Sequence, residues 1–122
     1  MTKDALLQFA KETYGSEAEY LWAKFPDTCV LRHSRNRKWY AVLMEVTYRK
    51  LGIDQDGVTD VAVVKFDKFE TYAMAEQPGI CLAYHMNKDS WLTLLLDGSC
   101  PESTVTALLG HSYDLTKGKS KK

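Results

Sequence analysis

Two pairs of residues have side chains that could bind a metal ion. Cys29 precedes His33 by four positions, and Cys81 precedes His85 by the same interval. Thiolate and imidazole are the ligands that zinc prefers. On a strand, however, residues four apart are separated by about 13 Å, which is too far for one pair to chelate an ion, although residues of different strands could still converge. We predict no metal and no cofactor, and interpret both pairs as packing residues.

A second set of residues could bind an anion. The run 32–38 contains no acid and carries Arg32, His33, Arg35, Arg37 and Lys38, with Asn36 among them. The run 85–90 offers His85, Asn87 and Lys88, although Asp89 cancels part of its charge. Guanidinium groups pair with phosphate or guanine, and a β-hairpin is narrow enough to enter a DNA groove. The alternative is that both runs are ordinary solvated turns beside core tryptophans.

Two β-hairpins are expected to position these runs. Residues 28–33 and 38–48 are β-rich and flank the first run, whereas 80–84 and 91–96 flank the second. A further strand is predicted over 58–66.

Helices are expected at both ends of this sheet. Thr2 can cap an N-terminal helix that Gly15 ends, and Ser99 with Glu102 has the spacing of a capping box before a C-terminal helix.

The two hairpins resemble each other in sequence. An offset of 52 residues aligns seven identical pairs, among them Cys29 with Cys81, His33 with His85, Trp39 with Trp91 and Leu43 with Leu95. Roughly one or two identities would arise by chance. The repeat predicts two hairpins of one shared geometry. In each of them the cysteine and histidine share a face, and the tryptophan lies across the turn near the histidine.

Length and composition are typical of one domain. The 122 residues, of which 45% are hydrophobic, predict a single domain over 1–116 and a basic disordered tail over 117–122. The net charge of zero argues against a protein that coats nucleic acid by bulk attraction, so any such binding must come from local patches. Three cysteines without CxxC spacing favour reduced thiols, and the absence of a long apolar run favours a cytoplasmic protein outside the membrane.

Several motifs resemble the MmcQ/YjbR family over nearly the whole chain. The most specific is Tyr84-His85-Met86-Asn87-Lys88 followed by Trp91, and the others are Arg32-His33 through Lys38-Trp39-Tyr40-Ala41, Leu96-Asp97-Gly98 and Ser112-Tyr113. The resemblance implies a frataxin-like (CyaY-like) α+β fold, often described as a double-wing DNA-binding domain. It brings no catalytic residues, so we expect a protein that is not an enzyme. Frataxin-like folds also suggest iron, but Glu12, Glu17 and Glu19 are interrupted and indicate a solvated face.

Together these features predict a two-layer α+β domain with both terminal helices on one face of an antiparallel sheet and two projecting hairpin wings. DNA is the expected partner. Arg35, Arg37, Lys38 and Lys88 would contact phosphates, Asn36 and Asn87 would orient or read bases, and Arg32 and His85 would complete the surface. The alternative is a non-enzymatic module that binds another protein or a small ligand on an apolar second sheet face, through Trp39, Leu43, Trp91 and Leu95.

Overall fold

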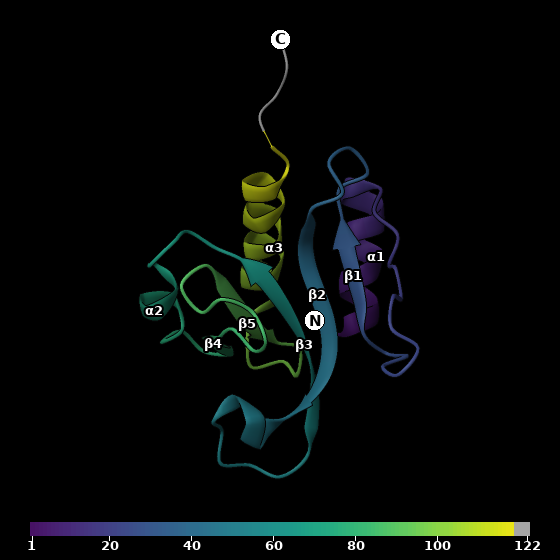
Figure 1. Ribbon diagram of the computed structural model, residues 1–122. Helices are drawn as coiled ribbons and strands as arrows, with labels where there is room; N and C mark the ends of the chain where they lie inside the picture. The colour runs from purple at the N-terminus through teal and green to yellow at the C-terminus, as the bar shows by residue number, and fades with distance from the viewer. Residues whose placement is uncertain (119–122) are drawn as a thin grey trace.

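The computed structural model describes residues 1–118, and residues 119–122 lie outside the described part. The elements in chain order are α1 (Lys3–Tyr14), β1 (Cys29–Arg32), β2 (Trp39–Thr47), the 3-10 helix η1 (Tyr48–Leu51), β3 (Val58–Lys65), α2 (Thr71–Met74), β4 (Ile80–Leu82), β5 (Trp91–Leu95) and α3 (Glu102–Thr116). Figure 1 shows the long helices beside a single sheet. The predicted α+β class is therefore confirmed.

The sheet is antiparallel throughout, with the strand order β1-β2-β3-β5-β4. The two predicted hairpins form its two edges, and β3 lies between them. Because β1 and β4 run in the same direction, the β1–β2 and β4–β5 connections both leave the same end of the sheet. The η1 helix lies at the other end (Figure 1).

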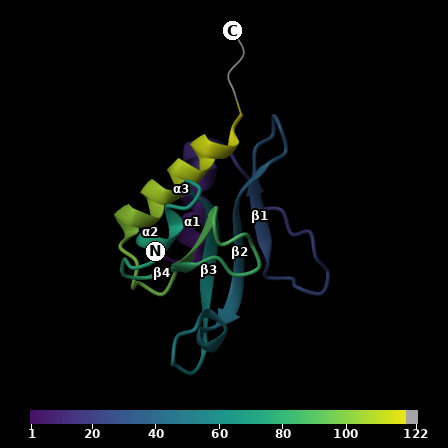
Figure 2. The ribbon, with the colours of Figure 1, turned by 60° about the vertical axis from the view of Figure 1, so that its left-hand side comes forward.

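One face of the sheet packs against α1 and α3, which lie together on that side in Figure 2. The core of this layer contains Leu6 and Ala10 from α1 and Leu109 from α3, all fully buried, with Leu43 and Leu92 from the sheet. This arrangement confirms the predicted placement of both terminal helices on one face.

The second face carries no long helix. Its buried residues include Val42, Val61 and Leu95, and loop side chains such as Trp22 and Met86 pack over them. Leu95 lies here as predicted, but Leu43 lies in the helix-covered core, so its predicted place on the second face was wrong. Trp39 and Trp91 are half-buried on this face.

The predicted N-cap forms in α1, but the predicted capping box of α3 does not. The hydroxyl of Thr2 accepts a hydrogen bond from Ala5 N–H, and Gly15 takes the left-handed conformation that ends α1, as predicted. The predicted capping box of α3 does not form. Ser99 instead donates both its N–H and its hydroxyl to the Asp97 carboxylate, and Pro101 occupies the N-cap position.

A β-bulge interrupts the first hairpin. Leu31 pairs with Ala41 and Arg32 with Trp39, so Tyr40 is the extra residue. The hydroxyl of Ser112 donates to the Tyr40 carbonyl at 2.6 Å and accepts from Lys65 N–H at 2.9 Å. Ser112, on α3, therefore bonds polar backbone groups that the irregular pairing leaves free, and the bulge turns Trp39 toward the second face.

Candidate functional site

The first loop, residues 33–38, is fixed to the C-terminal end of α3. His33 Nε2 lies 2.8 Å from Thr116 Oγ1, and Asn36 Nδ2 donates to the Thr116 carbonyl at 2.9 Å. The other amide atom, Asn36 Oδ1, accepts from Lys38 N–H at 2.9 Å. Figure 1 shows this loop beside the last turn of α3. Three hydrogen bonds therefore shape the loop and hold it against the helix end.

His33 lies inside the fold. Its side chain is 5% exposed, and its ring packs on Tyr40 and Tyr113 with centroid separations of 5.3 and 4.3 Å. Burial lowers the pKa of His33 below its ordinary value, so the neutral ring is favoured. The residue that the sequence placed at the tip of a wing thus anchors the wing, and the tryptophan predicted to lie near it is on the opposite face of the sheet.

Two arginines of the predicted DNA-binding surface, Arg32 and Arg37, lie against one carboxylate of the protein. The Arg32 guanidinium donates twice to the Glu19 carboxylate, at 2.9 and 2.6 Å, and Arg37 approaches the same carboxylate at 3.5 Å. The hydrogen bond from Arg32 holds the pKa of Glu19 below its usual range. Glu19 was predicted to belong to a solvated face. It is half-buried because its backbone pairs with Val30 at the edge of β1.

Four exposed cations of the described residues lie at this end, and we call them the basic end: Arg35, Arg37, Lys38 and Lys117. A hollow of about 230 Å³ opens between the loop and α3, and its lining includes Ser34, Arg35 and Lys117. Lys117 also lies 3.5 Å from Asp114. Lys117 and Gly118, which the sequence assigned to the tail, thus lie directly after α3, and the rest of the predicted tail lies outside the described residues.

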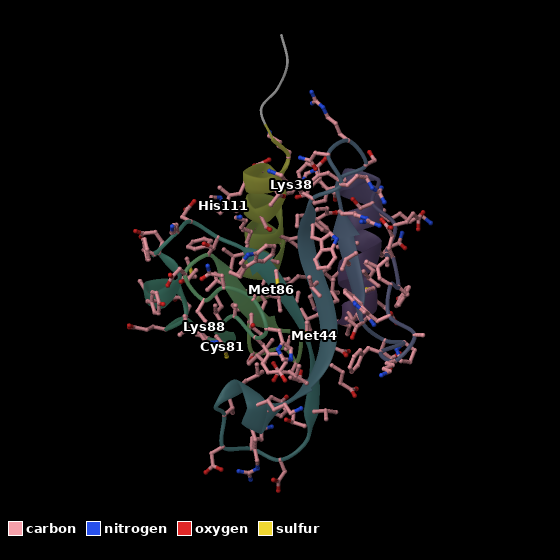
Figure 3. The ribbon with its side chains drawn as sticks, viewed as in Figure 1. Lys38, Met44, Cys81, Met86, Lys88 and His111 are labelled. Atoms are coloured by element: carbon pink, nitrogen blue, oxygen red, sulfur yellow. The ribbon has the colours of Figure 1, made fainter. Side chains whose placement is uncertain are left out.

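The second loop does not join the basic end. Thr71 donates its hydroxyl to the Lys88 carbonyl at 2.6 Å, and Tyr72 donates its hydroxyl to Asp89 at 2.6 Å, so the loop is tied to α2. Although this loop leaves the same end of the sheet as the first loop, its Lys88 lines a groove together with Lys50 and Gly52 of the η1 region. Lys38 and Lys88 lie well apart in Figure 3.

The other predicted residues of this loop are exposed. His85 has φ +66° and its ring lies 3.9 Å from the ring of Tyr84, measured between centroids. Asn87 Oδ1 accepts from Asp89 N–H at 2.9 Å and thereby shapes the turn, as Asn36 does in the first loop.

An apolar groove of about 610 Å³ runs along β2 on the second face. Its lining includes Trp39, Val42 and Met44 from β2, together with Met86 and with Phe25, which is 62% exposed. Trp22, which also lines the groove, packs edge-to-face on Trp39, and the two ring centroids are 5.7 Å apart. Part of the apolar surface predicted for the alternative function is therefore present, although Trp91 does not line this groove and instead lies under Lys65.

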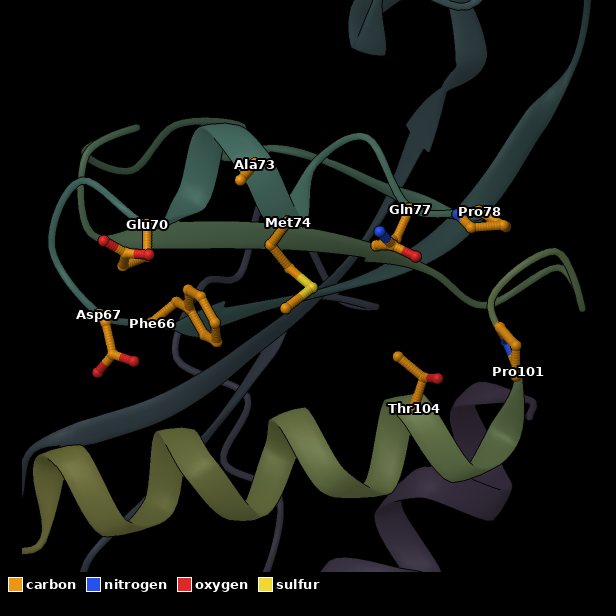
Figure 4. A pocket seen from close by; sticks show the side chains of 9 residues that line it. All are labelled: Phe66, Asp67, Glu70, Ala73, Met74, Gln77, Pro78, Pro101 and Thr104. Carbon is orange, nitrogen blue, oxygen red and sulfur yellow. The ribbon is translucent and has the colours of Figure 1, made fainter.

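A second cavity, of about 520 Å³, separates α2 from α3 (Figure 4). Phe66 and Met74 lie at its centre, and the carboxylates of Asp67 and Glu70 lie at one end. No cation lines it within residues 1–118. Asp67 Oδ2 lies within hydrogen-bond distance of His111 Nε2, at 3.1 Å. This acidic cavity is a poor place for a polyanion.

The described residues offer little support for metal or thiol chemistry. No group of three or more His, Cys, Asp or Glu side chains among them is arranged to hold a metal ion. Burial raises the pKa of the three free thiols, Cys29, Cys81 and Cys100, which disfavours the reactive thiolate. No helix in the described part of the chain is long and apolar enough to cross a bilayer.

Comparison with known proteins places the chain in a family. The family model described as YjbR matches residues 11–115. The chain belongs to the YjbR family. A curated relative, the uncharacterized protein YyaQ of Bacillus subtilis, is 33% identical over 117 residues, which cover 96% of this chain and 99% of YyaQ. The resemblance predicted from the sequence motifs is thereby confirmed.

Solved structures share the same fold. A crystal structure of a Pseudomonas syringae protein has a TM-score of 0.92 and 38% identity, covering 95% of this chain and 99% of that one. A solution NMR structure from the same organism has a TM-score of 0.88 and 36% identity over 100% and 98% of the two chains. A Deinococcus radiodurans protein with a DUF419 domain has a TM-score of 0.71 and 25% identity, covering 99% of this chain and 82% of that one.

Two residues of this candidate site, Glu19 and Thr116, had no predicted role in it, and Lys117 was predicted only as part of the basic tail. Glu19 is separated from Arg32 by 13 positions, and no local pattern links the two. Thr116 and Lys117 stand where helix and tail meet, and only the docking of the loop gives them a role. The Ser112-Tyr113 motif did carry a signal, because both residues contact the first hairpin.

Proposed function

We propose that this YjbR-family protein binds nucleic acid through its basic end. The observation that carries the proposal is the docking of the first loop on α3, which gathers Arg35 and Lys117 around one hollow and leaves Lys38 exposed on the same loop. Clustered arginine and lysine side chains are the usual ligands of backbone phosphates. In the sequence, Lys119, Lys121 and Lys122 follow, outside the described residues.

The helix end itself opposes an anion, because the last carbonyls of a helix carry partial negative charge. Asn36 offsets part of this effect by donating to the Thr116 carbonyl. We therefore assign Asn36 and His33 to holding the loop, and the exposed cations to contacting phosphates. Binding of this kind favours backbone over base contacts, so weak sequence preference is expected.

The number of cations sets the expected salt dependence. Arg35 and Lys38, which have no carboxylate partner among the described residues, would neutralise two phosphates and give a slope of about −1.8 in a plot of log K against log salt concentration for duplex DNA. The slope would steepen to about −3.6 if Arg37 and Lys117 left Glu19 and Asp114 to contact phosphates as well. The second loop is not needed for this contact, because Lys88 lines a separate groove with Lys50 and Gly52. Salt dependence therefore reports on the first loop and its surroundings.

A fluorescence anisotropy titration with a short labelled duplex, repeated with its single strand, tests the proposal. The double variant Arg35→Glu with Lys38→Glu is expected to weaken binding at least about tenfold and to flatten the salt slope. Lys24→Glu is the control, since this exposed lysine precedes β1 at the opposite end of the sheet. Absence of binding at low salt, or an equal loss in the control, contradicts the proposal.

The apolar groove along β2 supports a second candidate, a non-enzymatic module for an apolar ligand or protein segment. The specific observation is a groove whose lining includes the exposed Phe25 and Met44 of β2. Flexible thioethers and aromatic rings suit an adaptable apolar contact. The apolar dye ANS is a direct probe: Met44→Glu should reduce its fluorescence enhancement several-fold, and unchanged dye binding would exclude this groove.

A further inference from the structure

The two edges of the sheet differ in how their outward backbone groups are bonded. At the β1 edge, Glu19 N–H donates to the Val30 carbonyl at 3.0 Å, and Val30 N–H donates to the Glu19 carbonyl at 2.9 Å. The segment before β1 thus closes this edge. At the other edge lies β4, a strand of three residues.

The pairing of β4 with β5 shows which of its backbone groups point outward. Leu95 N–H donates to the Gly79 carbonyl at 2.8 Å, and Cys81 lies opposite Thr93. Because bonded pairs alternate in an antiparallel ladder, Cys81 bonds inward and Ile80 and Leu82 present their backbone outward. Of these outward groups, the Ile80 N–H donates a hydrogen bond to the Gln77 carbonyl. No described residue bonds the Ile80 carbonyl or the N–H and carbonyl of Leu82.

A groove of about 520 Å³ follows this free edge. Leu51 and Ala75 contribute apolar surface to it. Its charged side chains are Lys50 and Lys88, which are both exposed, and no carboxylate lines it in the described part of the chain. No ion pair within 4.0 Å involves either lysine among the residues described.

We propose that the β4 edge binds an extended acidic peptide, which adds to the sheet as a sixth strand. Two free acceptors and one free donor in a row match the backbone of an added strand, and apolar side chains of the peptide would enter the groove. Lys50 and Lys88 would pair with its carboxylates. A second copy of this chain would bring the same lysines together, and this repulsion favours an acidic partner over self-pairing.

This site is independent of the nucleic-acid proposal. The free edge is lined by η1 and the segment after α2, whereas the basic end lies at the first loop and α3. Either contact could fail without affecting the other, and the two experiments use different lysines.

An NMR titration of the full chain with acetyl-Val-Glu-Val-Glu-Val-Glu-amide tests the proposal. The Leu82 amide signal should shift, and its hydrogen exchange should slow at least about tenfold at saturation, because the amide gains a bonding partner. The Val30 amide, already bonded to Glu19, should not change. The matching peptide with lysine in place of glutamate should bind at least about tenfold more weakly.

Two variants separate backbone from charge recognition. Leu82→Pro removes the outward N–H, which an edge strand tolerates, and should abolish binding. Lys50→Glu with Lys88→Glu should reverse the preference between the two peptides, whereas Lys24→Glu should retain it. If Leu82→Pro does not fold, the Lys50→Glu with Lys88→Glu variant still tests whether the peptide binds at this edge. An unperturbed Leu82 amide, equal binding of both peptides, or protection of Leu82 by self-association without peptide would overturn the proposal.

Discussion

The two hairpins carry the same sequence pattern, yet they place it on opposite faces of the sheet. Cys29 and Leu43 lie in the helix-covered core, whereas their counterparts Cys81 and Leu95 pack on the second face. His33 is buried and anchors a loop, whereas His85 is exposed. Repeated residues therefore need not have repeated environments.

The strand order explains this reversal. In the order β1-β2-β3-β5-β4, the second hairpin is related to the first by rotation about an axis along β3, which preserves strand direction and exchanges the faces. Trp39 and Trp91, in contrast, lie on the same face of the sheet, because the bulge at Tyr40 adds one residue to the first hairpin and reverses the side on which Trp39 lies. The prediction of one shared geometry was correct for the hairpin form and wrong for its faces.

The largest expected contrast concerns the paired leucines. Leu43→Ala should lower the free energy of unfolding by about 4 kcal/mol, because it opens a cavity between the sheet and the helices. Leu95→Ala should cost about 2 kcal/mol, since the loops over the second face can partly collapse onto the space. Urea unfolding measures both values. A larger cost for Leu95→Ala would contradict the assignment of the main core to the helix-covered face.

The paired histidines should differ next. His33→Ala removes buried ring contacts and the hydrogen bond to Thr116, and should cost about 2 kcal/mol near neutral pH. His85→Ala should change stability by less than about 0.5 kcal/mol, because the side chain is exposed. Thermal or urea unfolding of both variants under the same conditions measures this difference. Equal losses of unfolding free energy would contradict the assignment of His33 to the interior and His85 to the surface.

The pH dependence sharpens the histidine comparison. The pKa of His33 is lowered in the folded state, so below its ordinary value of about 6.5 the unfolded chain takes up a proton that the folded chain excludes. The stability of the wild type should therefore fall as pH decreases from about 6.5 toward the folded-state pKa. His33→Ala should lack this component, so its deficit relative to wild type should shrink at acidic pH. A deficit that grows would mean that the pKa is raised instead.

Much of the fold follows from local sequence signals. The Thr2 cap, the Gly15 terminus and the strands were predictable because they depend on neighbouring residues, and the predicted strand bounds differ from the structure by at most two residues. The failed capping box at Ser99 shows the limit of such signals, since Asp97 competes for the same side chain.

The candidate site was less predictable. Its residue types were visible in the sequence, but the roles of Arg32 and His33 depend on Glu19 and Thr116, which reach them only through the folded chain. The direction of the second loop likewise depends on bonds from Thr71 and Tyr72. Contacts between residues so far apart in the sequence produce no periodic pattern of residue types, so they could not be predicted from the sequence.

The smallest expected contrast concerns the paired asparagines. Asn36→Ala should cost about 1 kcal/mol, because Asn36 both shapes its loop and bonds α3, whereas Asn87→Ala should cost about 0.5 kcal/mol, because Asn87 is seen to shape only its own turn. Chemical unfolding of the two variants measures this difference. Identical small losses would indicate that the bond to Thr116 adds nothing to the docking of the first loop.

The most direct test of the nucleic-acid proposal is an amide NMR titration of the full chain with duplex DNA at low salt. The basic end predicts that signals of Ser34 to Lys38 and of Thr116 and Lys117 shift, while those of His85 to Lys88 stay unchanged. Equal shifts in both loops would restore a double-wing contact, and the absence of shifts in the first loop would contradict the account.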